Sequence, residues 1–210
     1  MKYSAIIPCG GIGSRLNLGY NKILYKINDK LLIERTINNF ILDEDCLEVV
    51  IVYQKDDYKL LNKTIKHPKV KFVLGGATRE ESVYNGLKMA ISEYVLIHDG
   101  ARPNVNKELI ERIKNKLNDY ECVIPVVKSK DATLIDKEYH TKEILLIQTP
   151  QALNRELLIK AMEQVDLSKF KDDGSVYSYV YKKEIGIVEG DYSNIKVTTI
   201  DDLSKIKEEE

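Results

Sequence analysis

Cysteine is scarce in this chain, and its pattern excludes two kinds of site. The 3 cysteines among 210 residues are Cys9, Cys46 and Cys122, and no two of them have C-x-x-C spacing. So small, odd and scattered a set forms neither a disulfide framework nor a zinc site. Cys46 and Cys122 are expected in or near the core. Cys9 lies in a glycine-rich stretch without a neighbouring histidine, which disfavours a nucleophilic role.

The chain also lacks an excess of charge of one sign and a long apolar run. It has 32 Lys and Arg against 33 Asp and Glu, whereas nucleic-acid binders usually have a basic excess. No run of about 18 apolar residues is available to cross a membrane, and the opening MKYSAIIP is too short for a signal peptide. We therefore expect a cytoplasmic protein that binds neither nucleic acid nor a membrane.

Apolar runs of strand length alternate with stretches of helical periodicity. The strand candidates are YSAIIP, LEVVIVY, VKFVL, YVLIHD and CVIPVV, and the helix candidates are LLIERTINNF, YKLLNKTI, SVYNGLKMAI and ELIERIKNKL. This order predicts a Rossmann-like α/β fold with a mostly parallel sheet flanked by helices. The length predicts a single domain, residues 1–210.

One segment departs from this alternation. Residues 128–148, KSKDATLIDKEYHTKEILLIQ, alternate only weakly between apolar and polar residues and have a turn-like middle. They are predicted either as a β-hairpin that protrudes from the main sheet or as a long surface connection.

Three strand candidates end in loops of unusual composition. CGGIGSR follows the first, GGATRE the third and DGARP the fourth. Ligands of parallel sheets bind beyond the carboxyl ends of the strands, so the three loops are expected to meet at one edge. Glycines in such loops let backbone N–H groups approach phosphate oxygens closely.

The first loop fits neither of two common phosphate-binding motifs. Counting from Gly10, a Walker motif requires glycine at the sixth position, which is Arg15. The dinucleotide motif matches at its first two glycines, but Leu16 stands at the third. Gln54, not an acidic residue, follows the second strand, so a nicotinamide oxidoreductase is disfavoured.

Two cations accompany the glycine loop: Arg15 lies inside it and Lys22 shortly after it. Backbone donors alone can hold a cofactor pyrophosphate, whereas added cations suit a phosphate on which charge develops during transfer. The alternative is that both are ordinary surface cations after a tight turn.

The other loops add candidates for a nucleotide and a metal. Ser82 begins a helix in GGATREESVYNGL, either as a capping residue or as a contact for a base or ribose beside Gly75 and Gly76. Asp99 ends the apolar strand of VLIHDGARP. A carboxylate there suits Mg²⁺ held jointly by phosphates and water, although an aspartate there could also cap a helix. His98 beside it is expected to be structural.

Five segments together resemble one enzyme family. In chain order they are GGIGSR…NK, GGATREESVYNGL, HDGARP, TPQAL and EGDYSNIKVTT. Each is weak alone, but the set resembles the cytidylyltransferases that act on 2-C-methyl-D-erythritol 4-phosphate in isoprenoid precursor synthesis. A sister group that acts on ribitol 5-phosphate shares several segments, and the second and third are closer to the methylerythritol branch. The resemblance implies transfer of CMP from CTP to a polyol phosphate with release of pyrophosphate.

The resemblance also implies roles for the matching positions. The positions expected to bind CTP are Pro8, Cys9, Gly10, Gly11, Ile12, Gly13, Ser14, Arg15, Lys22, Gly75, Gly76, Ser82, Asp99 and Gly100. The positions expected to hold the polyol phosphate are Arg102, Asp131, Thr133, Thr149 and Lys196. Arg15, Lys22 and Lys196 would be catalytic, and Asp99 would bind Mg²⁺, the implied cofactor. The family forms homodimers in which a β-arm completes the partner's site, and residues 128–148 match that arm in position.

Departures from the family pattern cluster on the acceptor side. Ala132 and Leu134 stand where a threonine and a lysine are expected, an arginine expected in the arm is absent, and Lys171 or Asp172 replaces a threonine. Among the segments expected to bind CTP, Asn21 stands where many members have proline. Ribitol 5-phosphate or another phosphorylated alcohol, used in surface-polymer or capsule synthesis, is therefore the alternative acceptor.

A catalytically silent nucleotide-binding protein is the remaining alternative. Arg15, Lys22, Asp99 and Lys196 are all present, which argues against it. The chain has 3 histidines and no evident Ser-His-Asp set. That scarcity agrees with attack by a phosphate oxygen, which is already ionised near neutral pH and needs no strong base.

Overall fold

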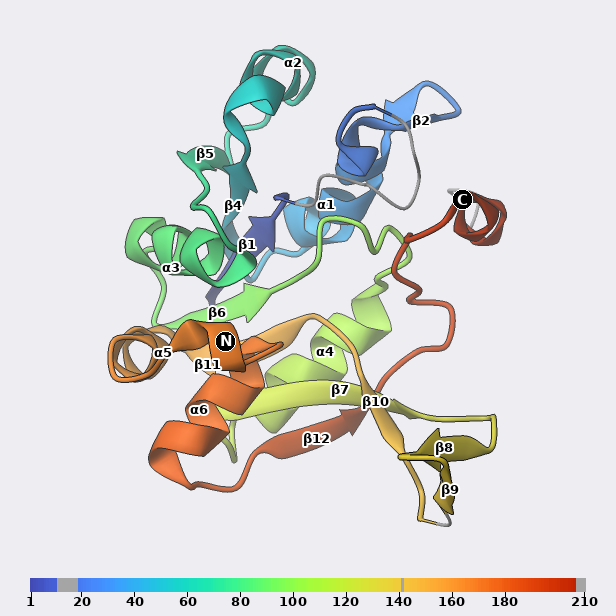
Figure 1. The fold of residues 1–210 in the computed structure, drawn as a ribbon. Coiled ribbons are helices and arrows are strands. Elements are labelled where there is room, and N and C mark those ends of the chain that lie inside the picture. Colours follow the sequence, from blue (N-terminus) through green and yellow to red (C-terminus); the bar gives the residue numbers. More distant parts are fainter. Residues whose placement is uncertain (11–18, 141, 207–210) are drawn as a thin grey trace.

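A central sheet with helices on both faces organises the computed structural model, which describes residues 1–10, 19–140 and 142–206 (Figure 1). The sheet has the order β10-β7-β11-β6-β1-β4-β5, and β12 also pairs with β7. Its strands are β1 Tyr3–Pro8, β4 Cys46–Tyr53, β5 Val70–Leu74, β6 Tyr94–Ile97, β7 Cys122–Lys128, β10 Leu145–Ile147, β11 Gln151–Asn154 and β12 Gly186–Glu189. The predicted α/β fold with a mostly parallel sheet is confirmed.

Four parallel strands form one half of the sheet. β6, β1, β4 and β5 run in the same direction, and Ile6 of β1 is in register with Val50 on one side and Ile97 on the other. Ala5 and Ile7 enter the core on one face, whereas Ile6 enters the core on the opposite face. Strands buried on both faces are continuous apolar runs, which makes them recognisable in the sequence.

Six helices of the described residues cover the two faces. α1 Leu32–Leu42, α2 Tyr58–Thr64 and α4 Lys107–Lys116 pack on the Ala5 face, and α3 Arg79–Met89, α5 Arg155–Met162 and α6 Asp173–Tyr181 pack on the Ile6 face. Side-chain oxygens of Thr78, Asn106, Asn154 and Asp172 cap four of them by accepting a first-turn N–H. Within the described ranges no helix has the length and apolar content to span a membrane. The cytoplasmic location stays a prediction.

Beyond residue 148 the sequence pattern predicts no element, and the structure adds β11, α5, α6 and β12 there. β11 runs antiparallel to both of its neighbours, with Ala152 in register with Leu96 of β6 and Val123 of β7. It joins the parallel half to β7. β10 pairs with the same edge of β7 as β11, and β12 pairs with the opposite edge. β11 has only 4 residues, too few for a periodic pattern.

Two small hairpins stand apart from the main sheet. β2 Lys26–Ile27 and β3 Lys30–Leu31 precede α1, and β8 Thr133–Ile135 pairs with β9 Glu138–His140. Residues 136 and 137 form the turn of the second hairpin with φ of 51° and 69°, the left-handed values that a two-residue hairpin turn requires. The structure thus supports the protruding hairpin, and Leu145–Ile147 return to the main sheet (Figure 1).

Candidate active site

The described parts of the three glycine-containing loops meet at the carboxyl edge of the parallel strands, as the strand-end rule predicts. They border a cleft of about 180 Å³, together with the 3-10 helix Lys22–Leu24 and a segment near the C-terminus. The described residues that line it are Pro8, Cys9, Gly10, Asn21, Lys22, Ile23, Gln54, Ala77, Thr78, Arg79, Asp99, Gly100, Ala101 and Lys196.

Gln54 lies between two of these loops, close to a glycine on each. A Cβ on Gly10 would lie 2.8 Å from its Nε2, and a Cβ on Gly75 would lie 3.3 Å from the same atom. The amide could shift to make room at Gly10. A Cβ on Gly75, however, would also lie 2.8 Å from Ser82 Oγ and 3.2 Å from the Tyr53 carbonyl oxygen, so glycine is favoured there. Gln54 is not among the predicted site residues, yet it directly follows β4, so the strand-end rule would have found it.

Ser82 holds the second glycine turn together. Its hydroxyl donates to the Thr78 carbonyl oxygen at 2.8 Å and accepts the Gly76 N–H at 3.1 Å. Thr78, one turn earlier, is the residue that caps α3. The one proton of the Ser82 hydroxyl is therefore used within the turn. Contact of Ser82 with a base or ribose stays a prediction.

Asp99 is surrounded by three cations, and the four residues are here called the Asp99 cluster. Its carboxylate lies 3.0 Å from Nζ of Lys196, 3.3 Å from Nε of Arg102 and 3.8 Å from Nε of Arg79. Burial alone would raise the pKa of Asp99, but Lys196, Arg79 and Arg102 outweigh it and hold the pKa well below its usual range. The carboxylate is thus ionised, with a surplus of positive charge around it.

Arg79 joins the cluster to α6. Its Nη1 and Nη2 donate to the two carboxylate oxygens of Asp173 at 3.2 and 2.8 Å, and the Asp173 side chain is 2% exposed. This bidentate pair fixes the plane of the guanidinium group. Neither residue is among the predicted site residues, because their pairing spans 94 positions.

His98 orients Thr149 behind Asp99. Its Nε2 faces the Arg102 carbonyl oxygen at 3.0 Å, so this nitrogen carries the proton, and Nδ1 accepts from the Thr149 hydroxyl at 3.0 Å. The same hydroxyl accepts the Asp99 N–H at 3.1 Å. Complete burial lowers the pKa of His98 to about 4, so the ring is neutral at pH 7. The structural role predicted for His98 agrees with this geometry.

Residues 190–199, here called the C-terminal strap, carry Lys196 without forming a helix or strand. Arg102 donates to the Asn194 carbonyl oxygen at 2.8 Å, and Lys22 donates to the Val197 carbonyl oxygen at 2.7 Å. Asn194 in turn donates to the Thr149 carbonyl oxygen at 2.7 Å. Segments HDGARP, TPQAL and NIKVTT, far apart in sequence, are therefore brought together here.

The predicted residues fall into five groups. Those that line the cleft are Pro8, Cys9, Gly10, Lys22, Asp99, Gly100 and Lys196. Gly75, Gly76 and Ser82 form the adjoining turn, and Arg102 and Thr149 lie beside Asp99. Asp131 and Thr133 lie at the start of the β8–β9 hairpin and do not line the cleft. The residues outside the described ranges are Gly11, Ile12, Gly13, Ser14 and Arg15.

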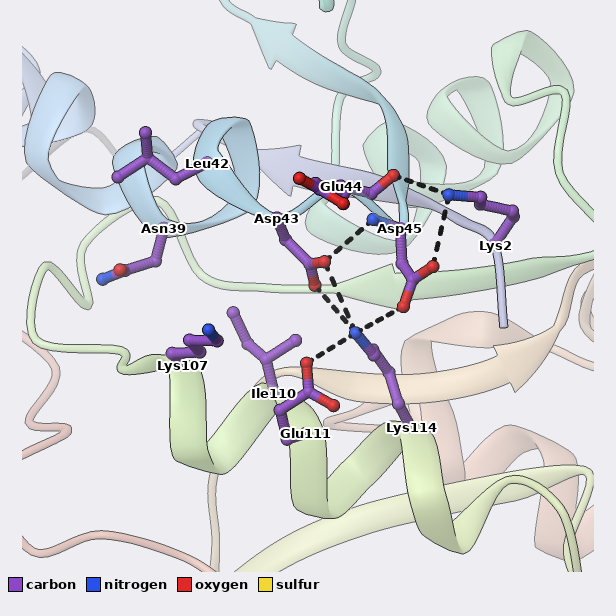
Figure 2. Close-up of a pocket in the computed structure, with 10 residues that line it drawn as sticks. All are labelled: Lys2, Asn39, Leu42, Asp43, Glu44, Asp45, Lys107, Ile110, Glu111 and Lys114. Atoms are coloured by element: carbon purple, nitrogen blue, oxygen red, sulfur yellow. Dashed lines mark hydrogen bonds and ion pairs between the residues drawn. The ribbon is translucent and has the colours of Figure 1, made fainter.

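A larger cavity, about 520 Å³, lies at the opposite edge of the sheet (Figure 2). There the Lys114 side chain, 6% exposed, contacts Asp43 at 3.2 Å, Asp45 at 2.7 Å and Glu111 at 2.7 Å. These four residues are here called the Lys114 cluster. They fasten α4 to the loop between α1 and β4, at the amino ends of the strands, where α/β sheets do not place their ligands.

Glycine turns, cations and an ionised carboxylate at the carboxyl edge of a mostly parallel sheet define an α/β protein of the nucleotidyltransferase type. The chain belongs to the IspD family, the 2-C-methyl-D-erythritol 4-phosphate cytidylyltransferases, whose family model matches residues 3–208. The curated enzyme of that name from Bacillus thuringiensis (strain Al Hakam) is 34% identical over 214 residues, covering 96% of this chain and 94% of the relative.

Solved structures agree with this membership. The bifunctional IspDF of Campylobacter jejuni has a TM-score of 0.88 at 30% identity, covering 98% of this chain and 54% of that chain. The 4-diphosphocytidyl-2C-methyl-D-erythritol synthase of Anaerococcus prevotii has a TM-score of 0.83 at 31% identity, covering 97% of this chain and 95% of that chain. The family resemblance drawn from the sequence is confirmed.

Proposed function

We propose that this chain transfers CMP from CTP to 2-C-methyl-D-erythritol 4-phosphate and releases pyrophosphate. The observation that carries the proposal is the Asp99 cluster, in which an ionised carboxylate and a surplus of cations border a cleft beside glycine turns. Family membership over residues 3–208 supports the choice of the two substrates.

The reaction requires little acid–base chemistry from the protein. An oxygen of the acceptor phosphate attacks the α-phosphorus of CTP and forms a new P–O bond. The bond from the α-phosphorus to the oxygen that bridges to the β-phosphate breaks, and its electron pair leaves with pyrophosphate. A phosphate monoester has its second pKa near 6, so the attacking oxygen is mostly ionised at pH 7. The described residues lining the cleft accordingly include no histidine.

The main obstacle is the repulsion between two polyanions. Two unit charges about 4 Å apart repel by roughly 4 kcal/mol at an effective dielectric constant of about 20. Lys22 and Lys196 reach the cleft from opposite ends of the chain and would offset this repulsion while the phosphates align. Arg15, outside the described residues, is proposed to act with them at the α-phosphate.

Asp99 suits a Mg²⁺ ion that arrives with the nucleotide. It is the only carboxylate among the described residues that line the cleft, and Mg²⁺ often takes one or two carboxylates with substrate phosphates and water. We propose that Asp99 holds this ion, which when bound would neutralise charge on the triphosphate. Lys196 Nζ lies 3.0 Å from Asp99 Oδ2, so the lysine and the metal would compete for that oxygen.

The β8–β9 hairpin is proposed to act between subunits. Residues 1–210 would form one cytidylyltransferase domain, with residues 128–148 as the arm of a homodimer. Leu134 and Tyr139 are 59% and 78% exposed on this hairpin, which leaves apolar surface for a partner to cover. Asp131 and Thr133 would then contribute to the acceptor site of the other subunit. Sedimentation of Leu134→Ser with Tyr139→Ser tests this: a monomer is expected, and an unchanged dimer contradicts the arm's role.

Pyrophosphate release with CTP and a panel of polyol phosphates tests the function. Turnover is expected with 2-C-methyl-D-erythritol 4-phosphate and Mg²⁺, and much slower turnover with ribitol 5-phosphate. Preference for ribitol 5-phosphate would overturn the acceptor while retaining the reaction. Absence of release with every acceptor, despite CTP binding, would identify a silent nucleotide-binding protein. ATP, GTP and UTP in place of CTP provide the matched control for the base.

A further inference from the structure

Asn21, the residue before Lys22, uses every polar atom of its side chain in hydrogen bonds. Its Nδ2 donates to the Cys9 carbonyl oxygen at 2.6 Å and to Oδ2 of Asp57 at 2.7 Å. Its Oδ1 accepts the Ile23 N–H at 3.3 Å. Asn21 is 9% exposed, so these bonds are shielded from water. The amide has no proton left for a ligand, although it borders the cleft.

The three partners of Asn21 belong to different parts of the fold. Cys9 directly follows β1, and Asp57 ends a short 3-10 helix, Lys55–Asp57, that follows β4. Ile23 belongs to the 3-10 helix Lys22–Leu24, which Asn21 caps. Because β1 and β4 are neighbouring strands, one side chain joins both of their carboxyl ends to the turn that carries Lys22.

We propose that Asn21 and Asp57 form a clamp that positions Lys22 for CMP transfer. The inference rests on the proposed function, in which Lys22 acts at the phosphates. Lys22 lines the cleft and also donates to the Val197 carbonyl oxygen at 2.7 Å, next to Lys196. The clamp therefore fixes the backbone position from which the Lys22 side chain reaches both the cleft and the C-terminal strap. Asn21 and Asp57 are positioning residues, because they act through Lys22.

The buried carboxylate of Asp57 makes the clamp depend on the Asn21 amide. Asp57 is 8% exposed, and a buried carboxylate requires a hydrogen-bond donor. Burial raises the pKa of Asp57, and the bond from Asn21 opposes that rise. Loss of the Asn21 amide would leave both Asp57 and the Cys9 carbonyl oxygen without this donor. The turn at Lys22–Leu24 would then be free to shift, and displacements of about 1 Å in a catalytic group can cost roughly a hundredfold in rate.

A double-mutant cycle separates positioning from general destabilisation. We expect Asn21→Ala to lower kcat about tenfold while KM for CTP changes less than about threefold, because the lost interaction belongs to the transition state. In a Lys22→Ala background, Asn21→Ala should change kcat by less than about twofold. If the two substitutions lower kcat independently, so that their separate effects multiply in the double variant, the proposal is overturned. Asp57→Ala should repeat the pattern and replaces Asn21→Ala in the cycle if that variant does not fold.

Asn39→Ala is the matched control for this cycle. Asn39 lies on α1, away from the cleft, and its Nδ2 donates to the Val105 carbonyl oxygen at 2.7 Å. This variant should lower the melting temperature as Asn21→Ala does, because each loses an amide-to-carbonyl bond, but kcat should stay within about twofold of the parent. An equal loss of kcat in Asn39→Ala would mean that reduced stability alone explains the effect.

Hydrogen exchange provides a readout that does not depend on activity. The Ile23 N–H bonds to the Asn21 side chain, and the Leu24 N–H bonds to the Asn21 carbonyl oxygen at 2.9 Å. Faster exchange of a peptide covering residues 19–25 is expected in Asn21→Ala and in Asp57→Ala, but not in Asn39→Ala. Unchanged exchange of this peptide in Asn21→Ala and Asp57→Ala would overturn the proposed clamp. If the parent protein transfers no CMP to any acceptor, the proposed function fails, and exchange still shows whether the clamp orders this turn.

Discussion

The Asp99 cluster and the Lys114 cluster contain the same kinds of charged group in opposite proportions. In the Asp99 cluster three cations surround one carboxylate, at the carboxyl edge of the sheet. In the Lys114 cluster three carboxylates surround one lysine, at the amino edge, within the larger cavity (Figure 2). The first has positive charge to spare for a polyphosphate. The second uses all three ammonium protons on protein oxygens.

Neither cavity size nor the presence of ion pairs distinguishes the candidate active site from the Lys114 cluster. What distinguishes the Asp99 cluster is its surplus of cations, its place beyond the parallel strands and the glycine turns beside it. The Lys114 cluster lacks all three and joins α4 to the loop before β4. Substitutions in the Asp99 cluster should therefore change the rate of the reaction, and substitutions in the Lys114 cluster should change the stability of the fold.

Asp99→Asn should have the largest effect. The amide keeps the shape of the side chain but removes the charge that pairs with Lys196 and Arg102 and that is proposed to hold Mg²⁺. We expect kcat to fall by about a hundredfold, as for other electrostatic groups at a transition state. Pyrophosphate release measures it. Asp45→Asn in the Lys114 cluster is the control and should retain the parent rate; equal losses would erase the distinction between the clusters.

Lys196→Ala should have the next largest effect. We expect kcat to fall at least about tenfold, a barrier increase of roughly 1.4 kcal/mol, with an unchanged melting temperature. The fold should tolerate the loss because Arg102 and Arg79 continue to pair with Asp99. Lys205→Ala, which removes an exposed lysine from its pair with Asp202, is the control. An unchanged kcat would remove Lys196 from the mechanism.

Lys114→Met should change stability and leave the rate unaltered. Burial alone would lower the pKa of Lys114, but its hydrogen bonds to Asp45, Glu111 and Asp43 outweigh this and raise it. Without the lysine, three carboxylates face one another. Since two of them are partly solvated, we expect a loss of about 1–2 kcal/mol in the free energy of unfolding, less than for a fully buried pair. Urea unfolding measures it, with Lys116→Met, at a half-buried lysine of the same helix, as the control. A fall in kcat would contradict the separation of the clusters.

The smallest expected effect is a pH dependence of the Lys114 cluster. The hydrogen bond from Lys114 lowers the pKa of Asp45 to about 2, below the unfolded value of about 3.9. A depressed pKa stabilises the fold above the unfolded value, and this stability is lost as pH falls through the folded value. Unfolding free energy should therefore decline between about pH 4 and pH 2. Lys114→Met should decline less steeply over that range, and parallel curves would exclude Asp45 as a contributor.

Much of the fold could be predicted because its parallel half is built from strands buried on both faces. β1, β4 and β6 are apolar runs, and each is followed within a few residues by glycine or acidic residues at the carboxyl edge. This pattern is visible in the sequence alone. β11 could not be recognised in this way. Its 4 residues owe their strand conformation to pairing with β6 and β7 on either side, which is tertiary information.

The residues of the candidate site likewise include some that the sequence identifies and others that only the tertiary structure brings together. Lys22, Asp99 and Lys196 could be named because they adjoin recognisable motifs. The Arg79–Asp173 pair could not, since it spans 94 positions. Gln54 is within reach of the strand-end rule, but it does not match the dinucleotide motif, which requires an acidic residue at this position. Asn21 was visible only as a departure from a family pattern, whereas its three hydrogen bonds give it a physical role.

The way in which the C-terminal strap is held has a consequence for biogenesis. Side chains such as Arg102 and Asn194, rather than a strand ladder, fasten it to surfaces made by earlier parts of the chain. On the ribosome those surfaces emerge first, because synthesis proceeds from the amino terminus. The parallel half of the sheet can thus form before the strap follows it from the ribosome. The cleft is then completed only when the strap docks and brings Lys196 to Asp99.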